Sequence, residues 1–461
     1  MQTTASWALE LADRHALRER LATTCELAPD GRERITVGVL AGARSAIASA
    51  GGRSAIASAA ARSKDVSAGA RDDDESALPD ARFPVRTGCL TKLFTATLAR
   101  QACAAGDFAL GDRVADLLEP RTALVLAGIK VRHLLEHTHG LDDSLLDAAP
   151  RRSGGFIDAE RLANALGAAG RLSDPGELYS YSNSGAWLLA ALLERASGRR
   201  YAELLHERLF APSAIGWAPG PSAAAVSGTS ICAAVGRSLS VSLDGMLAFL
   251  RDHALAPDVA PVLERAREGR EIVPLPGWNV LERGVCLGWK YHGAGWFGHA
   301  SVWPEGSALV RVQPGERVAL VVVSTGRPAF AVAACLFGAR LPELAALHIP
   351  LPLRIDQFER LGPTHAYVGT YRSARWSVTI ASAGGGRLEL HALRRNADGS
   401  GCGPRLQAPL EPAENGVFFT GPPTIEEFPY VQFVTSRDGG FQHLWNGRYV
   451  LRRCRPAAGH H

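Results

Sequence analysis

Two residues that can do covalent chemistry stand three positions apart in RTGCLTKLFTA, residues 86–96. Cys89 is a nucleophile when it is ionised, and Lys92 is one of only four lysines in the chain. If a helix begins near Cys89, positions i and i+3 share one face, so the two side chains can touch. The partial positive charge at the start of that helix favours a thiolate at Cys89 and disfavours an ammonium at Lys92. Such a pair is suited to acyl transfer.

The C-x-x-K spacing alone fits two interpretations. One is an activated nucleophile, and the other is a buried cysteine followed by a surface lysine. A cysteine is more acidic than a lysine by about two units in model peptides, so a thiolate beside an ammonium is at least as favourable as a thiol beside a neutral amine. The surrounding motifs have to decide between the two interpretations.

The stretch RTGCLTKLFTATLARQACAAGDFALGDRVADLLEP, residues 86–120, resembles the active-site helix of the serine β-lactamase and penicillin-binding-protein superfamily. The resemblance is strongest to the class C β-lactamase and esterase branch, whose pattern is G-S-x-T-K-x-F-T-A with the serine as nucleophile. Cys89 stands at the serine position. The cysteine leaves three alternatives open: a site adapted to sulfur, an engineered change, or a protein that has lost catalysis.

Three further segments match motifs of this superfamily in the family's order, and the resemblance covers most of residues 30–340. VRHLLEHTHGLDD is similar to L-L-x-H-T-S-G-L, with His139 in place of serine. YSYSNSG carries the Y-x-N motif at Tyr181 and Asn183. GHASVW is similar to the strand that carries K-T-G or H-x-G, with His299 kept and Ser301 in place of glycine.

The resemblance implies catalytic roles for three residues. Cys89 would attack a carbonyl and carry the acyl group as a thioester. Lys92 would move the proton of the thiol or keep the sulfur ionised as a positive neighbour. Tyr181 would protonate the leaving group and then activate the acceptor, while Tyr179, two residues earlier, fits a packing role.

The resemblance also implies residues that bind the substrate. Asn183 would hold the lysine amine and a substrate amide oxygen, and His299 would hydrogen-bond Tyr181 or steer a substrate carboxylate. The backbone N–H groups of Cys89 and Val302 would stabilise the oxyanion. Ser301 adds a side chain where the substrate backbone lies close in the family, so it could reshape the pocket or block it.

We expect an enzyme that transfers an acyl group from Cys89 to an amine or hydroxyl acceptor, in the biosynthesis of specialised metabolites. Amines attack thioesters readily, whereas water competes poorly, so a cysteine favours transfer. The donor would be a small ester or a thioester, including one bound to a carrier protein. The alternatives are an esterase or peptidase that uses the same residues with water, and a catalytically silent binding protein.

Composition and motifs argue against other classes. The formal charge of +4 comes from scattered arginines without a basic run, which argues against a nucleic-acid partner. No apolar run is long enough to span a bilayer, and the charged N-terminus lacks a signal-peptide core, so we expect a cytoplasmic protein without a membrane partner. Eight scattered cysteines form no C-x-x-C pair, and no Rossmann glycine pattern or P-loop is present, so we expect no metal and no cofactor.

These residues have to be positioned by an α+β fold. The resemblance implies a β-lactamase/transpeptidase-like domain over 1–347, with an antiparallel sheet flanked by helices and an all-helical subdomain. A proline-bearing connector (348–363) precedes evenly spaced short strands over 364–456, which predict a small antiparallel barrel or sandwich that resembles a lipocalin. The remaining expected elements are an amphipathic surface helix at 1–21, strands at 34–42, 285–291, 295–303, 307–313 and 317–325, and helices at 90–106, 131–141, 184–198, 240–252 and 329–341. The turn PGER (314–317) should join the last two strands as a hairpin, and the helix at 90–106 should stop at Gly106. RSAIASA occurs at 44–50 and again at 53–59, which fits a duplicated hairpin edge, and the polar stretch 62–80 is expected to be a loop.

Overall fold

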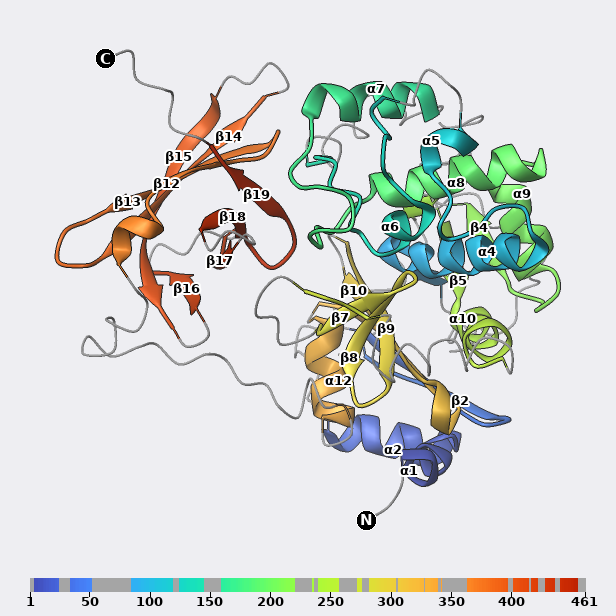
Figure 1. The fold of residues 1–461 in the computed structure, drawn as a ribbon. Coiled ribbons are helices and arrows are strands. Elements are labelled where there is room, and N and C mark those ends of the chain that lie inside the picture. The colour runs from blue at the N-terminus through green and yellow to red at the C-terminus, as the bar shows by residue number, and fades with distance from the viewer. Residues whose placement is uncertain are drawn as a thin grey trace, which may run out of the picture. The chain divides into compact units, whose positions relative to one another are not determined.

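The computed structural model of the chain divides into two compact units (Figure 1). The first unit contains Met1–Ala109, Leu189–Ile272 and Leu281–Leu347, and the second contains Leu110–Leu188, Val273–Val280 and His348–His461. The structure describes residues 4–24, 34–51, 84–118, 124–144, 159–219, 234–235, 239–256, 272–275, 282–303, 306–326, 328–338, 341, 363–396, 401–413, 416–421, 428–435 and 440–454.

An antiparallel sheet forms the centre of the first unit, with the strand order β2-β1-β11-β10-β9-β8-β7. The central strands β1, β10 and β11 are buried along almost their whole length. The turn predicted at PGER joins β10 to β11 as a hairpin. The strands are β1 (Arg34–Ala41), β2 (Arg44–Gly51), β7 (Gly284–Cys286), β8 (Trp289–Gly293), β9 (Trp296–Trp303), β10 (Gly306–Gln313) and β11 (Val318–Thr325).

The single strand predicted at 285–291 is wrong, because the chain turns back within it. Leu287 and Gly288 have φ values of 45° and 88° and form the two-residue turn between β7 and β8. Two consecutive positive φ values are typical of a tight hairpin turn. Lys290 of β8 therefore pairs with Val285 of β7.

Helices α1 (Thr4–Leu11), α2 (Arg14–Thr24) and α12 (Ala329–Phe337) pack against one face of this sheet. Trp7 lies edge-on against Phe337, with 5.6 Å between ring centroids. The prediction of one surface helix at 1–21 is wrong on two points. Asp13 Oδ1 accepts the His15 and Ala16 N–H groups and starts a second helix, and the apolar residues of both helices lie in the core.

Helix α4 (Thr91–Ala105) lies in the same unit and packs through Phe94. The Phe94 ring contacts Phe210 and Phe249, with centroids 5.4 Å and 4.5 Å away. The predicted stop is confirmed, since Gly106 follows the helix with φ of 82°. The neighbouring elements are β3 (Pro84–Arg86), β4 (Trp217–Pro219), β5 (Leu239–Ser242), α9 (Tyr201–Leu205), α10 (Leu243–Phe249) and the π-helical turns His206–Phe210 and Leu250–Ala254.

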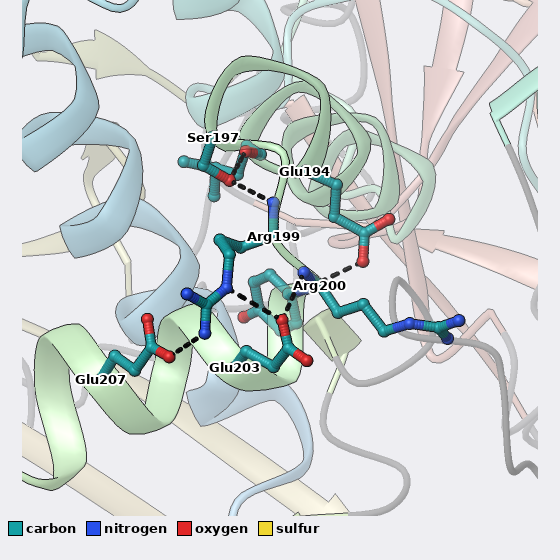
Figure 2. Close-up of polar contacts among 8 residues, drawn as sticks. Glu194, Ser197, Arg199, Arg200, Glu203 and Glu207 are labelled. Carbon is teal, nitrogen blue, oxygen red and sulfur yellow. Dashed lines mark hydrogen bonds and ion pairs between the residues drawn. The ribbon is translucent and has the colours of Figure 1, made fainter.

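Figure 2 shows the connection between α8 (Ser184–Ser197) and α9. Glu194 Oε1 accepts the Tyr201 N–H at 2.8 Å, and Glu203 Oε2 accepts the Arg200 N–H at 3.1 Å. The buried Tyr201 hydroxyl lies 2.6 Å from Thr95 Oγ1 on α4. The exposed Arg–Glu pairs in the same view contribute little to stability, whereas the buried Tyr201 hydroxyl links this connection to α4.

The second unit combines short helices with a closed barrel. Its helices are α5 (Val114–Leu117), α6 (Val131–Leu135), α7 (Ala159–Ala169) and the first turn of α8, and the two-residue strand β6 (Val273–Pro274) also belongs to it. Tyr371, Phe418, Phe433 and other apolar side chains form the core of the barrel. The barrel strands are β12 (Gly369–Arg372), β13 (Trp376–Ser382), β14 (Leu388–Arg395), β15 (Gly401–Pro412), β16 (Val417–Thr420), β17 (Tyr430–Thr435), β18 (Phe441–Trp445) and β19 (Val450–Arg453).

The predicted α+β class with a trailing antiparallel barrel is confirmed, and the barrel closes between β12 and β19. The repeated RSAIASA at 53–59, the loop predicted at 62–80 and the connector at 348–362 lie outside the described residues. Among the helices that the structure describes, none combines the length and hydropathy that a membrane span requires.

Candidate active site

Cys89 lies in a tight turn at the entry to α4. The turn Gly88–Leu90 has 3₁₀ geometry and leads directly into the α-helix at Thr91. The Thr87 hydroxyl donates to the Leu239 carbonyl at 2.9 Å, and the Thr91 hydroxyl donates to Thr87 Oγ1 at 2.8 Å. The first bond anchors the turn to β5, and the second links the residue before the turn to the first residue of α4. The helix entry that the sequence predicts is therefore held in place.

Lys92 occupies the first turn of α4 and is only 4% exposed, whereas Cys89 is half-buried. A surface lysine, one of the two interpretations of the C-x-x-K spacing, is therefore wrong. Burial of a lysine is unusual unless the residue has a structural or chemical role. The interaction between Lys92 and Cys89 that the family resemblance implies stays a prediction.

Ser301 is placed against the cysteine turn. It lies in β9, is 2% exposed, and its Oγ accepts the Cys89 N–H at 3.1 Å. Gly88 has φ of 44°, and a Cβ at this position would collide with the same Ser301 Oγ. The residue before Cys89 is therefore restricted to glycine for two reasons, its backbone conformation and its contact with Ser301.

The other two predicted residues of β9 flank Ser301. His299 is fully buried, and its Nδ1 lies 2.9 Å from the Ala300 nitrogen and 2.8 Å from the Ala300 carbonyl oxygen. Val302, on the other side, is 82% exposed. The proposed contacts of His299 with Tyr181 or a carboxylate, and of the Val302 N–H with an oxyanion, stay predictions.

Tyr181 and Asn183 belong to the second unit, where the carboxylate of Asp143 holds their segment. Asp143 Oδ2 accepts the Ser182 hydroxyl at 2.9 Å, the Asn183 N–H at 2.9 Å and the Ser184 N–H at 3.0 Å. Two of these donors are backbone groups at the start of α8, where a negative charge is stabilised. One buried carboxylate therefore fixes the Y-S-N motif and the start of its helix.

Asp143→Ala is expected to lower the free energy of unfolding by about 3 kcal/mol, because three buried donors lose their acceptor. Urea unfolding of both proteins measures this difference. Asp116→Ala is the matched control, since its carboxylate pairs with Arg113 at 2.9 Å on the surface and should cost less than about 0.5 kcal/mol. Equal losses in the two variants would contradict a structural role for Asp143.

His139, which replaces the family's serine, supports the same segment. Its Nδ1 accepts the Leu141 N–H at 3.1 Å, so the proton of the neutral ring lies on Nε2. Nε2 lies 2.7 Å from Ser182 Oγ and therefore donates to it. Burial lowers the pKa of His139 to about 3. Ser182 directs its own proton to Asp143, so this buried Ser–His pair has a structural role.

The His137 ring and the Arg448 guanidinium pack on Tyr181, the predicted acid. His137, with φ of 55°, accepts the Ser182 N–H at Nδ1, and its ring lies 4.8 Å from that of Tyr181 and 5.8 Å from that of Tyr179. Both tyrosines therefore pack on one histidine, which agrees with the packing role expected for Tyr179. On Tyr181, the Arg448 guanidinium lies 5.0 Å from the ring centroid, a cation–π arrangement that restrains the ring.

The barrel takes part in this arrangement within the second unit. In the hairpin between β18 and β19, the Arg448 carbonyl accepts the Tyr181 N–H at 2.9 Å. The Val450 N–H donates to Ser180 Oγ at 3.2 Å, and the Arg375 N–H donates to Ser144 Oγ at 3.1 Å. The barrel is therefore bonded directly to the backbone of the Y-S-N segment.

Sequence reasoning missed His137, Asp143 and Arg448. The first two flank His139 in the segment HTHGLDD, so its resemblance to a family motif could have directed attention to them. No sequence pattern pointed to Arg448, because it lies in a short turn of the barrel and matches no motif. Within the described ranges, no three His, Cys, Asp or Glu side chains are grouped closely enough to hold a metal ion.

Comparisons with known proteins agree with this architecture. A family model described as Beta-lactamase matches residues 28–337. Penicillin-binding protein 4 of Amycolatopsis lactamdurans is 27% identical over 302 residues, which cover 58% of this chain and 78% of that protein.

Two solved structures show the same fold. A crystal structure of SurE with D-Leu has a TM-score of 0.69 at 23% identity and covers 96% of this chain and 99% of that one. A D-stereospecific amidohydrolase from Streptomyces sp. has a TM-score of 0.51 at 19% identity and covers 70% and 99%. The family model spans more than half of the chain, which therefore belongs to the Beta-lactamase family, within the superfamily of serine β-lactamases and penicillin-binding proteins.

Proposed function

We propose that the protein is an acyltransferase that carries its acyl group as a thioester on Cys89. The observation that supports this most directly is the position of Cys89. It stands where the family has its nucleophile, between a glycine that only fits as glycine and a buried lysine in the first turn of α4. A half-buried thiol at a helix start, three residues before a buried lysine, fits the pattern of a reactive cysteine.

The proposed first step forms the thioester. Cys89 Sγ forms a bond to the carbonyl carbon of the donor, and the carbonyl electron pair moves to the oxygen. When that oxygen re-forms the carbonyl, the bond to the leaving alcohol or thiol breaks. The leaving group takes a proton, which we assign to Tyr181, while Lys92 receives or balances the proton that the thiol gives up.

In the second step an amine or hydroxyl acceptor attacks the thioester. A new C–N or C–O bond forms, the C–S bond of Cys89 breaks, and the acceptor gives a proton to the Tyr181 phenolate. Because amines attack thioesters faster than water does, a cysteine at this position favours transfer over hydrolysis. Membership of a superfamily that contains hydrolases and acyltransferases supports both outcomes, and the sulfur is the feature that favours transfer.

The structural neighbours suggest which donors to test. One was crystallised with D-Leu, and another is named a D-stereospecific amidohydrolase. We therefore propose donors whose acyl group ends in a D-amino acid, offered as an ester, as a free thioester or on a carrier protein.

Mass spectrometry of the intact protein tests the proposal. We expect one acyl group per chain after incubation with N-acetylcysteamine thioesters of short peptides that end in D-Leu, and peptide mapping should place it on Cys89. Adding an amine should convert the released product from acid to amide. No mass increase with any ester or thioester would contradict the proposal. Acid that persists at high amine concentration would favour the alternative, a hydrolase.

A catalytically silent binding protein is the other alternative, and Ser301 together with Cys89 is the feature that permits it. It predicts that Lys92→Ala and Tyr181→Phe leave any residual turnover unchanged. The acyltransferase predicts that both changes slow turnover by at least about a hundredfold, the usual contribution of a proton-transfer group.

A further inference from the structure

The Ser301 hydroxyl accepts a hydrogen bond from the Cys89 N–H, the donor that the proposed reaction needs for its oxyanion. The Cys89 N–H points at Ser301 Oγ, with 3.1 Å between nitrogen and oxygen. In acyl-enzyme chemistry the backbone N–H of the nucleophile is a donor to the developing oxyanion. An N–H group has one proton, so the serine hydroxyl and the donor's carbonyl oxygen compete for it.

The contact is built into the first unit and is not a loose surface pairing. Ser301 is held in the middle of the sheet, where β9 pairs with β10 and Ser301 lies opposite Ala308. Its side chain is buried and packs against Gly88, where any Cβ would collide with the hydroxyl. The glycine before the nucleophile and the serine on β9 therefore fit each other as a pair.

We propose that Ser301 is an occluding residue, whose hydroxyl must leave the Cys89 N–H before an acyl donor can react. This inference rests on the proposed function. In the free protein the hydroxyl satisfies the N–H and keeps the cysteine turn ordered. An acyl donor has to rotate the Ser301 side chain away or displace it with its own backbone. Acylation therefore carries the free-energy cost of losing the hydrogen bond between the Cys89 N–H and Ser301 Oγ. Donors that bring additional binding contacts can offset this cost, whereas small esters cannot.

Removal of the hydroxyl should therefore accelerate the reaction with a small donor. With p-nitrophenyl acetate, Ser301→Ala and Ser301→Gly should raise the second-order rate constant for acylation of Cys89 by about tenfold, the factor expected for one competing hydrogen bond. Quenched-flow mass spectrometry measures the rate constant. Ser307→Ala is the matched control, because Ser307 is a buried serine on β10 whose Oγ accepts the Ala329 N–H at 2.7 Å, and the rate should not change.

A second measurement reports on the same N–H without catalysis. In protein labelled with ¹⁵N-cysteine, the Cys89 amide resonance, assigned by its absence in Cys89→Ala, should exchange with solvent at least about tenfold faster in Ser301→Ala than in the wild type. A purely structural serine would instead give slower acylation and lower stability in both Ser301 variants.

The outcomes separate this inference from the proposed function. If the wild type is acylated and Ser301→Ala is acylated no faster, the occluding role is wrong and the acyltransferase proposal stands. If iodoacetamide alkylates Cys89 but neither the wild type nor the Ser301 variants accept an acyl group, the proposed function fails and the inference fails with it. Faster acylation of both Ser301 variants, together with faster exchange of the Cys89 amide, supports the occluding role.

Discussion

Cys89→Ala is expected to abolish the covalent acyl-enzyme and to lower kcat/KM for ester and thioester donors by at least about a thousandfold. The alanine has no atom that can attack the carbonyl, so only binding and electrostatic stabilisation remain, as in other enzymes stripped of their nucleophile. Steady-state kinetics with N-acetylcysteamine thioesters measures the loss, and intact-mass analysis should show no acylated species.

Cys103→Ala provides the control for this experiment. Cys103 lies on the same helix, α4, and is half-buried like Cys89, yet it stands near the C-terminal end of that helix, away from the proposed chemistry. Its replacement should leave the kinetics within about twofold of the wild type. Full activity of Cys89→Ala would exclude a covalent mechanism through this residue.

Cys89→Ser restores the residue that the family has at this position and decides among the alternatives for the sulfur. A site adapted to the longer bonds and lower pKa of a thiol should be slower with serine, since a serine hydroxyl has to be deprotonated by a strong neighbouring base. Higher activity with serine would show that the surrounding site is still built for oxygen. Inactivity of both forms would favour the silent binding protein.

The elements that carry strong local signals could be predicted from the sequence. The run RITVGVLA and the stretch before Gly106 gave a strand and a helix at the right places, because hydrophobic period and a terminating glycine are local properties. The errors came from single residues that change the chain direction. Asp13 splits the first helix by capping the second, and the pair Leu287–Gly288 splits a strand by adopting positive φ.

The candidate site shows the same division. Motif order directed attention to Cys89 and Lys92, whose catalytic roles stay predictions, and Lys92 is buried rather than on the surface. The spacing of motifs does not show which residues far apart in the sequence are in contact. The sequence therefore predicted only that the Ser301 side chain lies close to the substrate, and not that it accepts the Cys89 N–H. Arg448 could not be found at all, because its approach to Tyr181 depends on how the barrel hairpin is bonded to the Y-S-N segment.

Lowering the pH from 7 to 4 is expected to destabilise the protein through His139, and this effect should disappear in His139→Gln. Burial lowers the pKa of His139 to about 3 from its ordinary value of 6.5. Between pH 6.5 and 3, His139 therefore binds a proton in the unfolded chain but not in the folded protein. The stabilisation is complete above pH 6.5 and is lost as the pH falls towards 3, at up to about 1.4 kcal/mol per pH unit.

The hydrogen bonds explain why the folded protein excludes the proton. Nδ1 of His139 accepts the Leu141 N–H, so a second proton would place two donors face to face, while Nε2 already donates to Ser182. Glutamine at this position does not titrate and retains both a donor and an acceptor. Urea unfolding at pH 7, 6, 5 and 4 should therefore show a shallower loss of stability in His139→Gln than in the wild type.

His365→Gln is the control for the loss of an imidazole, because His365 is exposed next to the barrel. The destabilisation through His139 grows through the whole window from pH 6.5 down to 3, because burial lowers its pKa. Since His139 supports Ser182 between Tyr181 and Asn183, acid should loosen the Y-S-N segment early in unfolding. Parallel pH curves for His139→Gln and the wild type would show that the buried imidazole does not control this transition.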